Sequence, residues 1–137
     1  MLDLGTGTGA VARGLALRGC EVTGLDHSAP LLAQALELDR AAGVQVTQVR
    51  ARVENAEFPP ASFDLVTAGQ CWHWFDRART AALVHGWLRP GGCLLIAHFD
   101  WLPLNDNLVQ DTERLILTCN PAWTLHSGSG MYPAWLK

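Results

Sequence analysis

The 137-residue sequence lacks the long apolar runs and the excess of basic residues that mark several classes of protein. No stretch approaches the roughly 18 apolar residues of a membrane span, and no basic segment followed by an apolar one stands at the start. Ten Lys and Arg residues stand against 13 Asp and Glu residues, which gives a formal net charge of −3. We therefore expect no membrane segment. We also expect no nucleic-acid partner, because the sequence as a whole carries no cationic excess to hold phosphates.

Cysteine is scarce and widely spaced. The four cysteines stand at positions 20, 71, 93 and 119 without a C-x-x-C pair, a pattern typical of reduced thiols rather than of disulfides or a zinc site. Cys71 and His73 lie close together, but no further Cys or His pair stands at ligand spacing, so we expect no metal. Reduced thiols and the missing signal sequence favour a cytoplasmic location.

What the sequence does contain is an alternation of apolar segments and segments with helical periodicity. The apolar segments predict strands at 2–4, 21–26, 44–50, 63–69 and 93–99. The periodic segments predict helices at 9–19, from a cap at Ser28 to Leu38, at 77–88 before the turn Pro90-Gly91-Gly92, and near 106–119. Continuously apolar strands that alternate with helices indicate a parallel sheet covered on both faces. The predicted class is doubly wound α/β, with a mostly parallel, Rossmann-like sheet and helices on both faces.

The alternation fades after Asp100, where one helical segment precedes a tail rich in Trp, Gly, Ser and Pro. No internal repeat, low-complexity tract or linker divides the chain. We expect a single domain over 1–137, with the core motifs in 2–100 and a partial C-terminal region in 101–137.

Three glycines follow the first predicted strand, at Gly5, Gly7 and Gly9. In an open parallel sheet the first strand-to-helix turn is a ligand site, and glycines let the backbone approach a ligand closely. Asp26 follows at the tip of the second strand, where a carboxylate can accept hydrogen bonds from the two hydroxyls of a ribose. Together these residues predict a nucleoside cofactor.

Two cofactors fit the glycine pattern, because it satisfies both the dinucleotide pattern G-x-G-x-x-G/A and the pattern G-x-G-x-G. Asp3 favours S-adenosylmethionine over NAD: a carboxylate just before the first glycine repels a pyrophosphate but can receive the ammonium group of a methionine moiety. In the alternative interpretation, Asp3 only caps the loop and Asp26 only caps the next helix.

Four segments resemble successive motifs of the class I S-adenosylmethionine-dependent methyltransferases, in the small-molecule group. They are LDLGTGTGAVA (2–12), VTGLDHSAPLLAQA (22–35), FPPASFDLVTAGQCWHWF (58–75) and WLRPGG (87–92). The resemblance implies S-adenosylmethionine as cofactor and a set of residues that bind it: Asp3, Gly5, Thr6, Gly7, Gly9, Asp26, His27, Val53 and Gln70. Among these, His27 would pack against adenine and the Val53 amide would serve a ring nitrogen. Arg52 stands where many relatives have the acid that receives the adenine amino group.

The segment AGQCWHWFD follows the fourth predicted strand, so its polar and aromatic side chains are expected around the transferable methyl group. Trp72 and Trp74 are candidates for contact with an apolar substrate, and neutral His73 is the candidate catalytic base for an attacking hydroxyl or amine. In the alternative interpretation, both tryptophans pack in the core and His73 is structural. The expected acceptor is a small molecule.

Members of this family usually begin with a helix before the first strand and continue past the fifth strand with a helix and two more strands. This sequence is expected to be truncated at both ends, without the first helix and without the final strand pair. The fifth strand would then have an unpaired apolar edge through which the protein can self-associate. Three hypotheses therefore stand: a small-molecule methyltransferase, a truncated fragment without catalytic activity, and an NAD-dependent oxidoreductase supported only by the shared glycine pattern.

Overall fold

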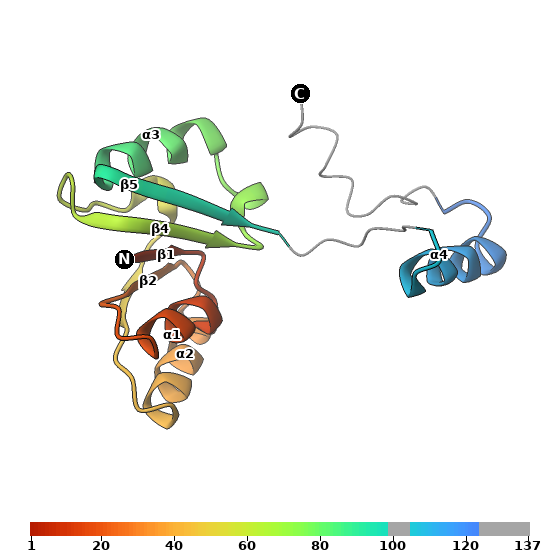
Figure 1. The fold of residues 1–137 in the computed structure, drawn as a ribbon, viewed down its shortest axis with the longest axis horizontal. Coiled ribbons are helices and arrows are strands. Elements are labelled where there is room, and N and C mark those ends of the chain that lie inside the picture. The colour runs from red at the N-terminus through yellow and green to blue at the C-terminus, as the bar shows by residue number, and fades with distance from the viewer. Residues whose placement is uncertain (99–104, 124–137) are drawn as a thin grey trace. The chain divides into compact units, whose positions relative to one another are not determined.

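A computed structural model describes residues 1–98 and 105–123 of the chain (Figure 1). Its contacts divide the chain into two units, Met1–His98 and Phe99–Lys137, and each unit is described by itself. The first unit holds nearly all of the stretch in which the core motifs are predicted. The prediction of one domain over 1–137 stays a prediction.

The first unit is built on a five-stranded parallel sheet. Its strands are β1 (Leu2–Leu4), β2 (Thr23–Asp26), β3 (Thr47–Arg50), β4 (Phe63–Gly69) and β5 (Leu88–Ala97). They stand in the order β3-β2-β1-β4-β5, and every neighbouring pair is parallel. The strand order reverses between β1 and β4, which confirms the predicted doubly wound class and makes the carboxyl ends of these two strands the switch point.

Three helices connect the strands: α1 (Ala10–Ala16), α2 (Ala29–Ala41) and α3 (Arg77–Trp87). Figure 1 shows α1 and α2 together beside β1 and β2, with α3 apart from them beside β5. Right-handed crossovers produce this division, because the chain runs outward in one direction through β2 and β3 and in the other through β4 and β5. Two short 3₁₀ turns, η1 (Val53–Asn55) and η2 (Trp72–Trp74), follow β3 and β4.

The core lies around the three inner strands, β2, β1 and β4. Leu2, Leu4, Leu25 and Val66 are fully buried there, as expected for strands covered on both faces. Beside β4, the Phe58 ring lies edge-on to Phe63 and Trp87 at centroid distances of 5.2 and 5.1 Å, an arrangement that aromatic pairs prefer. A smaller cluster of Ala12, Val22 and Val46 packs α1 against the sheet.

Several predicted boundaries were wrong. β2 begins at Thr23 and β3 at Thr47, two and three residues later than predicted. β5 begins at Leu88, directly after α3, so the predicted turn at 90–92 lies inside the strand. The ladder pairs Phe63 with Leu88 but Leu65 with Cys93, which leaves 89–92 as an irregularity of the kind found in bulges.

Glycine makes this irregularity possible, and sequence periodicity does not reveal it. A Cβ on Gly92 would lie 3.0 Å from the Arg89 carbonyl oxygen and 3.1 Å from that of Asp64. Ser28 is the N-cap of α2 as predicted, but its side chain makes no capping hydrogen bond. Its backbone N–H instead donates to Asp26.

Within the described residues of the first unit, β5 is one edge of the sheet, and no strand follows it in the described chain. Leu95 and Ile96 on this strand are 55% and 37% exposed. The described part of the second unit is α4 (Leu108–Cys119), which begins two residues later than predicted because Asn107 caps it. The Asn107 side chain accepts a hydrogen bond from the Gln110 N–H at 2.8 Å.

Candidate functional site

The turn between β1 and α1 is shaped by its glycines. Gly5, Gly7 and Gly9 have φ angles of +58°, +55° and +78°, in the left-handed region that residues with a Cβ rarely occupy. Gly9 is the N-cap of α1, and its N–H donates to the Thr6 carbonyl at 2.8 Å. The loop therefore presents backbone rather than side chains at the switch point of the sheet.

Cys71 closes the loop from the side of β4. Its Sγ donates to the Leu4 carbonyl at 3.0 Å, and a Cβ placed on Gly5 would lie only 2.8 Å from the Cys71 Cβ. Burial raises the pKa of the Cys71 thiol to about 12, with the charges of Asp3 and Asp26 as further causes. Cys71 is therefore a packing residue and not a nucleophile, because only a thiolate reacts readily.

Asp3 lies beneath the loop and is only 2% exposed. The register of the sheet sets it beside Thr67 on β4, whose hydroxyl donates to Asp3 Oδ1 at 2.6 Å, and the Thr6 hydroxyl donates to Oδ2 at 2.7 Å. Burial raises the pKa of this carboxyl above its ordinary value of 3.8, although the two hydroxyl groups act in the opposite direction. Asp3 thus fixes the start of the glycine loop from inside the sheet.

Asp26 connects the end of β2 to the same loop. Its Oδ2 accepts the Gly7 N–H at 2.9 Å and its Oδ1 accepts the Ser28 N–H at 2.8 Å. His27 Nδ1 lies 3.5 Å from Oδ1. A carboxylate offers about four acceptor positions, so both oxygens keep capacity for two hydroxyl donors of a ligand.

A cavity of about 260 Å³ opens where these segments meet. Residues after β1, β2, β3 and β4 contribute to its wall, as expected for a ligand site at the switch point. The lining residues are Gly5, Leu25, Asp26, His27, Ala51, Arg52, Val53, Glu54, Trp74 and Phe75.

The structure brings five of the predicted site residues to this cavity: Gly5, Asp26, His27, Val53 and Trp74. The other predicted residues do not line it: Asp3, Thr6, Gly7, Gly9, Gln70, Trp72 and His73. The Thr6 hydroxyl donates to Asp3, and the Gly7 N–H donates to Asp26, which lines the cavity. Gln70 lies at the end of β4 with a φ of +56°, and its N–H donates to the Ala97 carbonyl at 2.9 Å.

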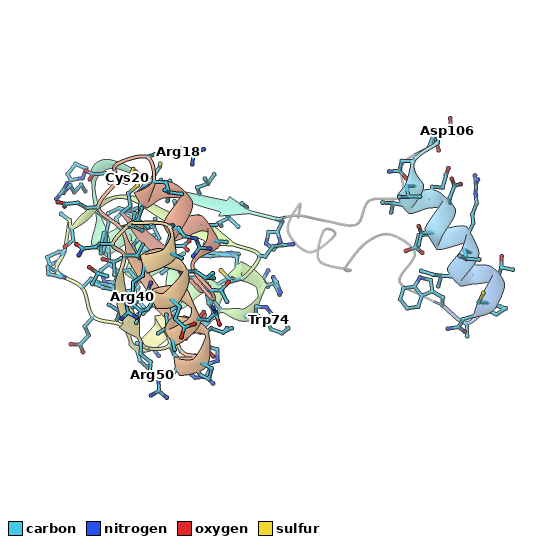
Figure 2. All side chains as sticks on the ribbon, turned by 90° about the horizontal axis from the view of Figure 1, so that it is seen from below. Arg18, Cys20, Arg40, Arg50, Trp74 and Asp106 are labelled. Carbon is cyan, nitrogen blue, oxygen red and sulfur yellow. The ribbon has the colours of Figure 1, made fainter. Side chains whose placement is uncertain are left out.

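The two tryptophans of η2 have opposite environments. Trp72 is 7% exposed and packs in the core with its ring edge-on to Phe75 at 6.1 Å, so the structure does not bring it to the proposed substrate position. Trp74 is 78% exposed, and Figure 2 shows it at the surface of the first unit. The side chains of a three-residue 3₁₀ turn point in different directions, so its first and last residues can have different environments.

His73 lies between them in η2. Its ring centroid is 4.6 Å from that of Trp74 and 5.6 Å from that of His98, which follows β5. The Nδ1 atom of His73 is buried without a hydrogen-bond partner in the described parts of the chain. In the tautomer that leaves this nitrogen unprotonated, the imidazole can accept a proton.

The set of site residues predicted from the sequence does not include Arg52, Glu54 or Phe75, yet all three line the cavity. Glu54 is held in place from α3: its Oε1 accepts the Asp76 N–H at 3.1 Å, and its carbonyl accepts from Arg79 Nη2 at 2.8 Å. For Arg52, the departure from the family pattern was the feature of the sequence that could have pointed to the cavity. No such feature marks Glu54 or Phe75, because their placement depends on the packing of η1 against α3.

Two negative findings concern the described residues alone. In that part of the chain no group of three or more His, Cys, Asp or Glu side chains is placed to hold a metal ion. Among the helices that the structure describes, none has the length and apolar character to cross a membrane.

Comparison with known proteins identifies the family of the chain. The family model described as "Methyltransferase domain" matches residues 2–96. The chain is 37% identical over 94 residues to an uncharacterized methyltransferase of Mycobacterium tuberculosis, and 38% identical over 95 residues to the malonyl-[acyl-carrier protein] O-methyltransferase of Enterobacter lignolyticus. Each match covers 69% of this chain, which spans 37% and 36% of the lengths of these relatives.

A solved structure of an S-adenosylmethionine-dependent methyltransferase from Mesorhizobium loti is similar at a TM-score of 0.63 and 36% identity. The match covers 74% of this chain and 46% of that one. The sheet order, the glycine turn and the family match agree over the same residues. The chain therefore belongs to the methyltransferase domain family.

Proposed function

We propose that this chain binds S-adenosylmethionine and takes part in methyl transfer to a small-molecule acceptor. The observation that carries the proposal is the place of Asp26. Its carboxylate lines the cavity, binds the Gly7 N–H and keeps acceptor capacity for the two hydroxyls of a ribose. A nucleoside held there would have its sugar beside the glycine loop.

The residues around Asp26 support the rest of the nucleoside. His27 and Val53 line the cavity next to it, where an imidazole face and a backbone amide suit an adenine ring. Trp74 shares this wall, which favours contact with the cofactor over the contact with the acceptor that the sequence predicted. The Arg52 guanidinium also lies at the wall and can stack on a planar base.

The methionine end of the cofactor is assigned to the loop and to Asp3. The carboxylate of Asp3 lies under the loop, where a cationic ammonium group would compensate its burial directly or through water. Gly9 and Thr6 shape the loop above it, and Gln70 follows β4 on the side where the transferable methyl group is expected.

Methyl transfer asks for positioning more than for acid–base chemistry, because the sulfonium of S-adenosylmethionine supplies an activated methyl group. An acceptor that arrives deprotonated needs no base. For a hydroxyl or amine acceptor, we assign the proton to Nδ1 of His73, which has no hydrogen-bond partner among the described residues. The relative from Enterobacter lignolyticus is an O-methyltransferase, and oxygen is one acceptor atom that this arrangement suits.

Two further expectations belong to the proposal. In the described part of the chain no strand pairs with the outer edge of β5, and Leu95 is more than half exposed there, which supports self-association of the chain. A cytoplasmic location rests on the reduced cysteines that the sequence predicts.

Isothermal titration of the folded chain with S-adenosylhomocysteine and, separately, with NADH tests the cofactor. We expect the first ligand to bind and the second not to bind, and Asp26→Ala to remove binding of the first. Asp64→Ala is the matched control, because Asp64 is an exposed carboxylate whose only described partner is Arg89. Binding of NADH alone would establish an oxidoreductase, and a folded chain that binds neither ligand would establish a fragment without independent activity.

A further inference from the structure

Asp39 is a buried carboxylate outside the cavity. It lies on α2, is 2% exposed and belongs to no motif that the sequence analysis singled out. A buried charge is costly unless it is paired and hydrogen-bonded. Its partners therefore define what it does.

Both oxygens of Asp39 are occupied by side chains from other elements. Arg13 Nη1 on α1 lies 3.2 Å from Oδ1, and Gln48 Nε2 on β3 donates to Oδ2 at 3.1 Å. Gly24 on β2 leaves room for this arrangement, since a Cβ there would lie 2.9 Å from Gln48 Oε1. The carboxylate thus connects two helices and an edge strand.

Arg13 extends this network to the glycine loop. The same Nη1 that meets Asp39 donates to the Thr8 carbonyl at 3.0 Å. Thr8 stands between Gly7, whose N–H is held by Asp26, and Gly9, whose N–H is held by the Thr6 carbonyl. The loop is therefore held by Asp26 at the Gly7 N–H and by Arg13 at the Thr8 carbonyl.

We propose that the Arg13–Asp39 pair is a positioning device that fixes the conformation of the cofactor loop from behind. The inference rests on the proposed function, because it assigns the loop to S-adenosylmethionine. Arg13 acts on the loop directly, and Asp39 acts through Arg13 by fixing its guanidinium. Neither residue lines the cavity, so neither is assigned contact with the ribose or the base.

Stability alone does not account for such a pair. Replacement of a buried ion pair by apolar residues of similar volume is often neutral or stabilising, whereas removal of one partner leaves an uncompensated charge. The informative variant is therefore Arg13→Met/Asp39→Leu, which removes both charges together. The matched control is Arg89→Met/Asp64→Leu, which removes an exposed Arg–Asp pair at 2.9 Å on the opposite side of the sheet order.

The first measurement needs no ligand. Amide hydrogen exchange at Gly9 reports the hydrogen bond to Thr6, and exchange at Thr80, which donates to the Asp76 carbonyl at the start of α3, is the internal reference. We expect faster exchange at Gly9 in Arg13→Met/Asp39→Leu, with no change at Thr80 and no change at either amide in the control variant. Unchanged exchange at Gly9 in the folded variant would overturn the proposal.

The second measurement separates the loop from the ribose site. S-adenosylhomocysteine and adenosine share the nucleoside, but only the first carries the methionine moiety that we assign to the loop. We expect Arg13→Met/Asp39→Leu to weaken the first ligand by about tenfold and to leave adenosine affinity within about twofold. A purely structural role would lower both affinities equally.

Failure of the two ideas gives different results. If the wild-type chain binds neither ligand, the proposed function fails, and the exchange measurement still decides whether Arg13 holds the loop. If the wild type binds and both affinities change equally, the positioning role fails alone. Should the double variant not fold, Arg13→Met/Asp39→Asn takes its place, because an asparagine oxygen can still accept from Gln48.

Discussion

Gly5 and Gly7 offer a direct test of how much of the glycine loop depends on space and how much on backbone conformation. Their φ angles are nearly equal, +58° and +55°. A left-handed conformation costs a residue with a Cβ about 1–2 kcal/mol. A Cβ on Gly7 would find only the Gly5 carbonyl oxygen, at 4.0 Å, whereas a Cβ on Gly5 would lie 2.8 Å from Cys71 Cβ and 2.9 Å from its Sγ.

Gly5→Ala therefore adds overpacking to the conformational cost. Overpacking in a dense core typically costs about 1–3 kcal/mol, so we expect Gly7→Ala to lower the free energy of unfolding by about 1–2 kcal/mol and Gly5→Ala by about 2–5 kcal/mol. The larger loss is a substantial part of the 5–15 kcal/mol that stabilises an ordinary domain. Urea denaturation followed by circular dichroism measures both values.

A double-mutant cycle isolates the steric part. Cys71→Gly removes the two nearest atoms that a Cβ on Gly5 would meet and leaves Phe75 Cζ, at 3.4 Å. The loss in Gly5→Ala/Cys71→Gly should therefore be smaller than the sum of the two single losses. The same cycle with Gly7→Ala should be additive. Equal losses in Gly5→Ala and Gly7→Ala, or an additive cycle at Gly5, would refute the reasoning from close packing.

Two further predictions concern groups with a raised pKa. Because the folded pKa of Asp3 lies above its ordinary 3.8, the folded state binds this proton more tightly, and the contribution of Asp3 to stability falls as the pH rises through the folded pKa. Asp3→Asn should therefore be at least as stable as the wild type in urea denaturation at pH 7, since the Thr67 hydroxyl can turn to the Leu2 carbonyl at 3.4 Å. The variant should bind S-adenosylhomocysteine more weakly. A large loss of stability at pH 7 that disappears at low pH would contradict this. The Cys71 thiol has a pKa of about 12, so it should resist iodoacetamide at pH 8 in the native protein while the exposed Cys93 reacts. Site-resolved mass spectrometry measures both modifications, and rapid modification of Cys71 in the native protein would contradict its burial.

The fold and the family followed from local patterns. Apolar runs, helical periodicity and the turn residues at each end can be read within short windows of sequence. They predict the bounds that β4 has in the structure, Phe63–Gly69. The errors lie where a neighbouring strand sets the boundary. β5 begins at Leu88 because it pairs with Phe63, and the irregularity at 89–92 then shifts the register for the rest of the strand.

The candidate site was predictable to the extent that a backbone requirement or a motif identifies a residue. The glycines and Asp26 belong to this class, because a left-handed turn and a carboxylate at a strand end have a sequence signature. The two tryptophans do not, since Trp72 and Trp74 stand in the same short segment and only the packing of η2 decides that the first is buried and the second is exposed.

By itself the sequence determined the doubly wound class, the glycine turn and the residue types at the switch point. Only the tertiary structure decided which side chains meet. The sheet register sets Thr67 beside Asp3, 64 residues away, and the packing of α1 on α2 sets Arg13 beside Asp39, 26 residues away. The reason is physical: periodicity and turn chemistry act between near neighbours along the chain, whereas a contact across strands or helices exists only after the whole sheet has chosen its order and register.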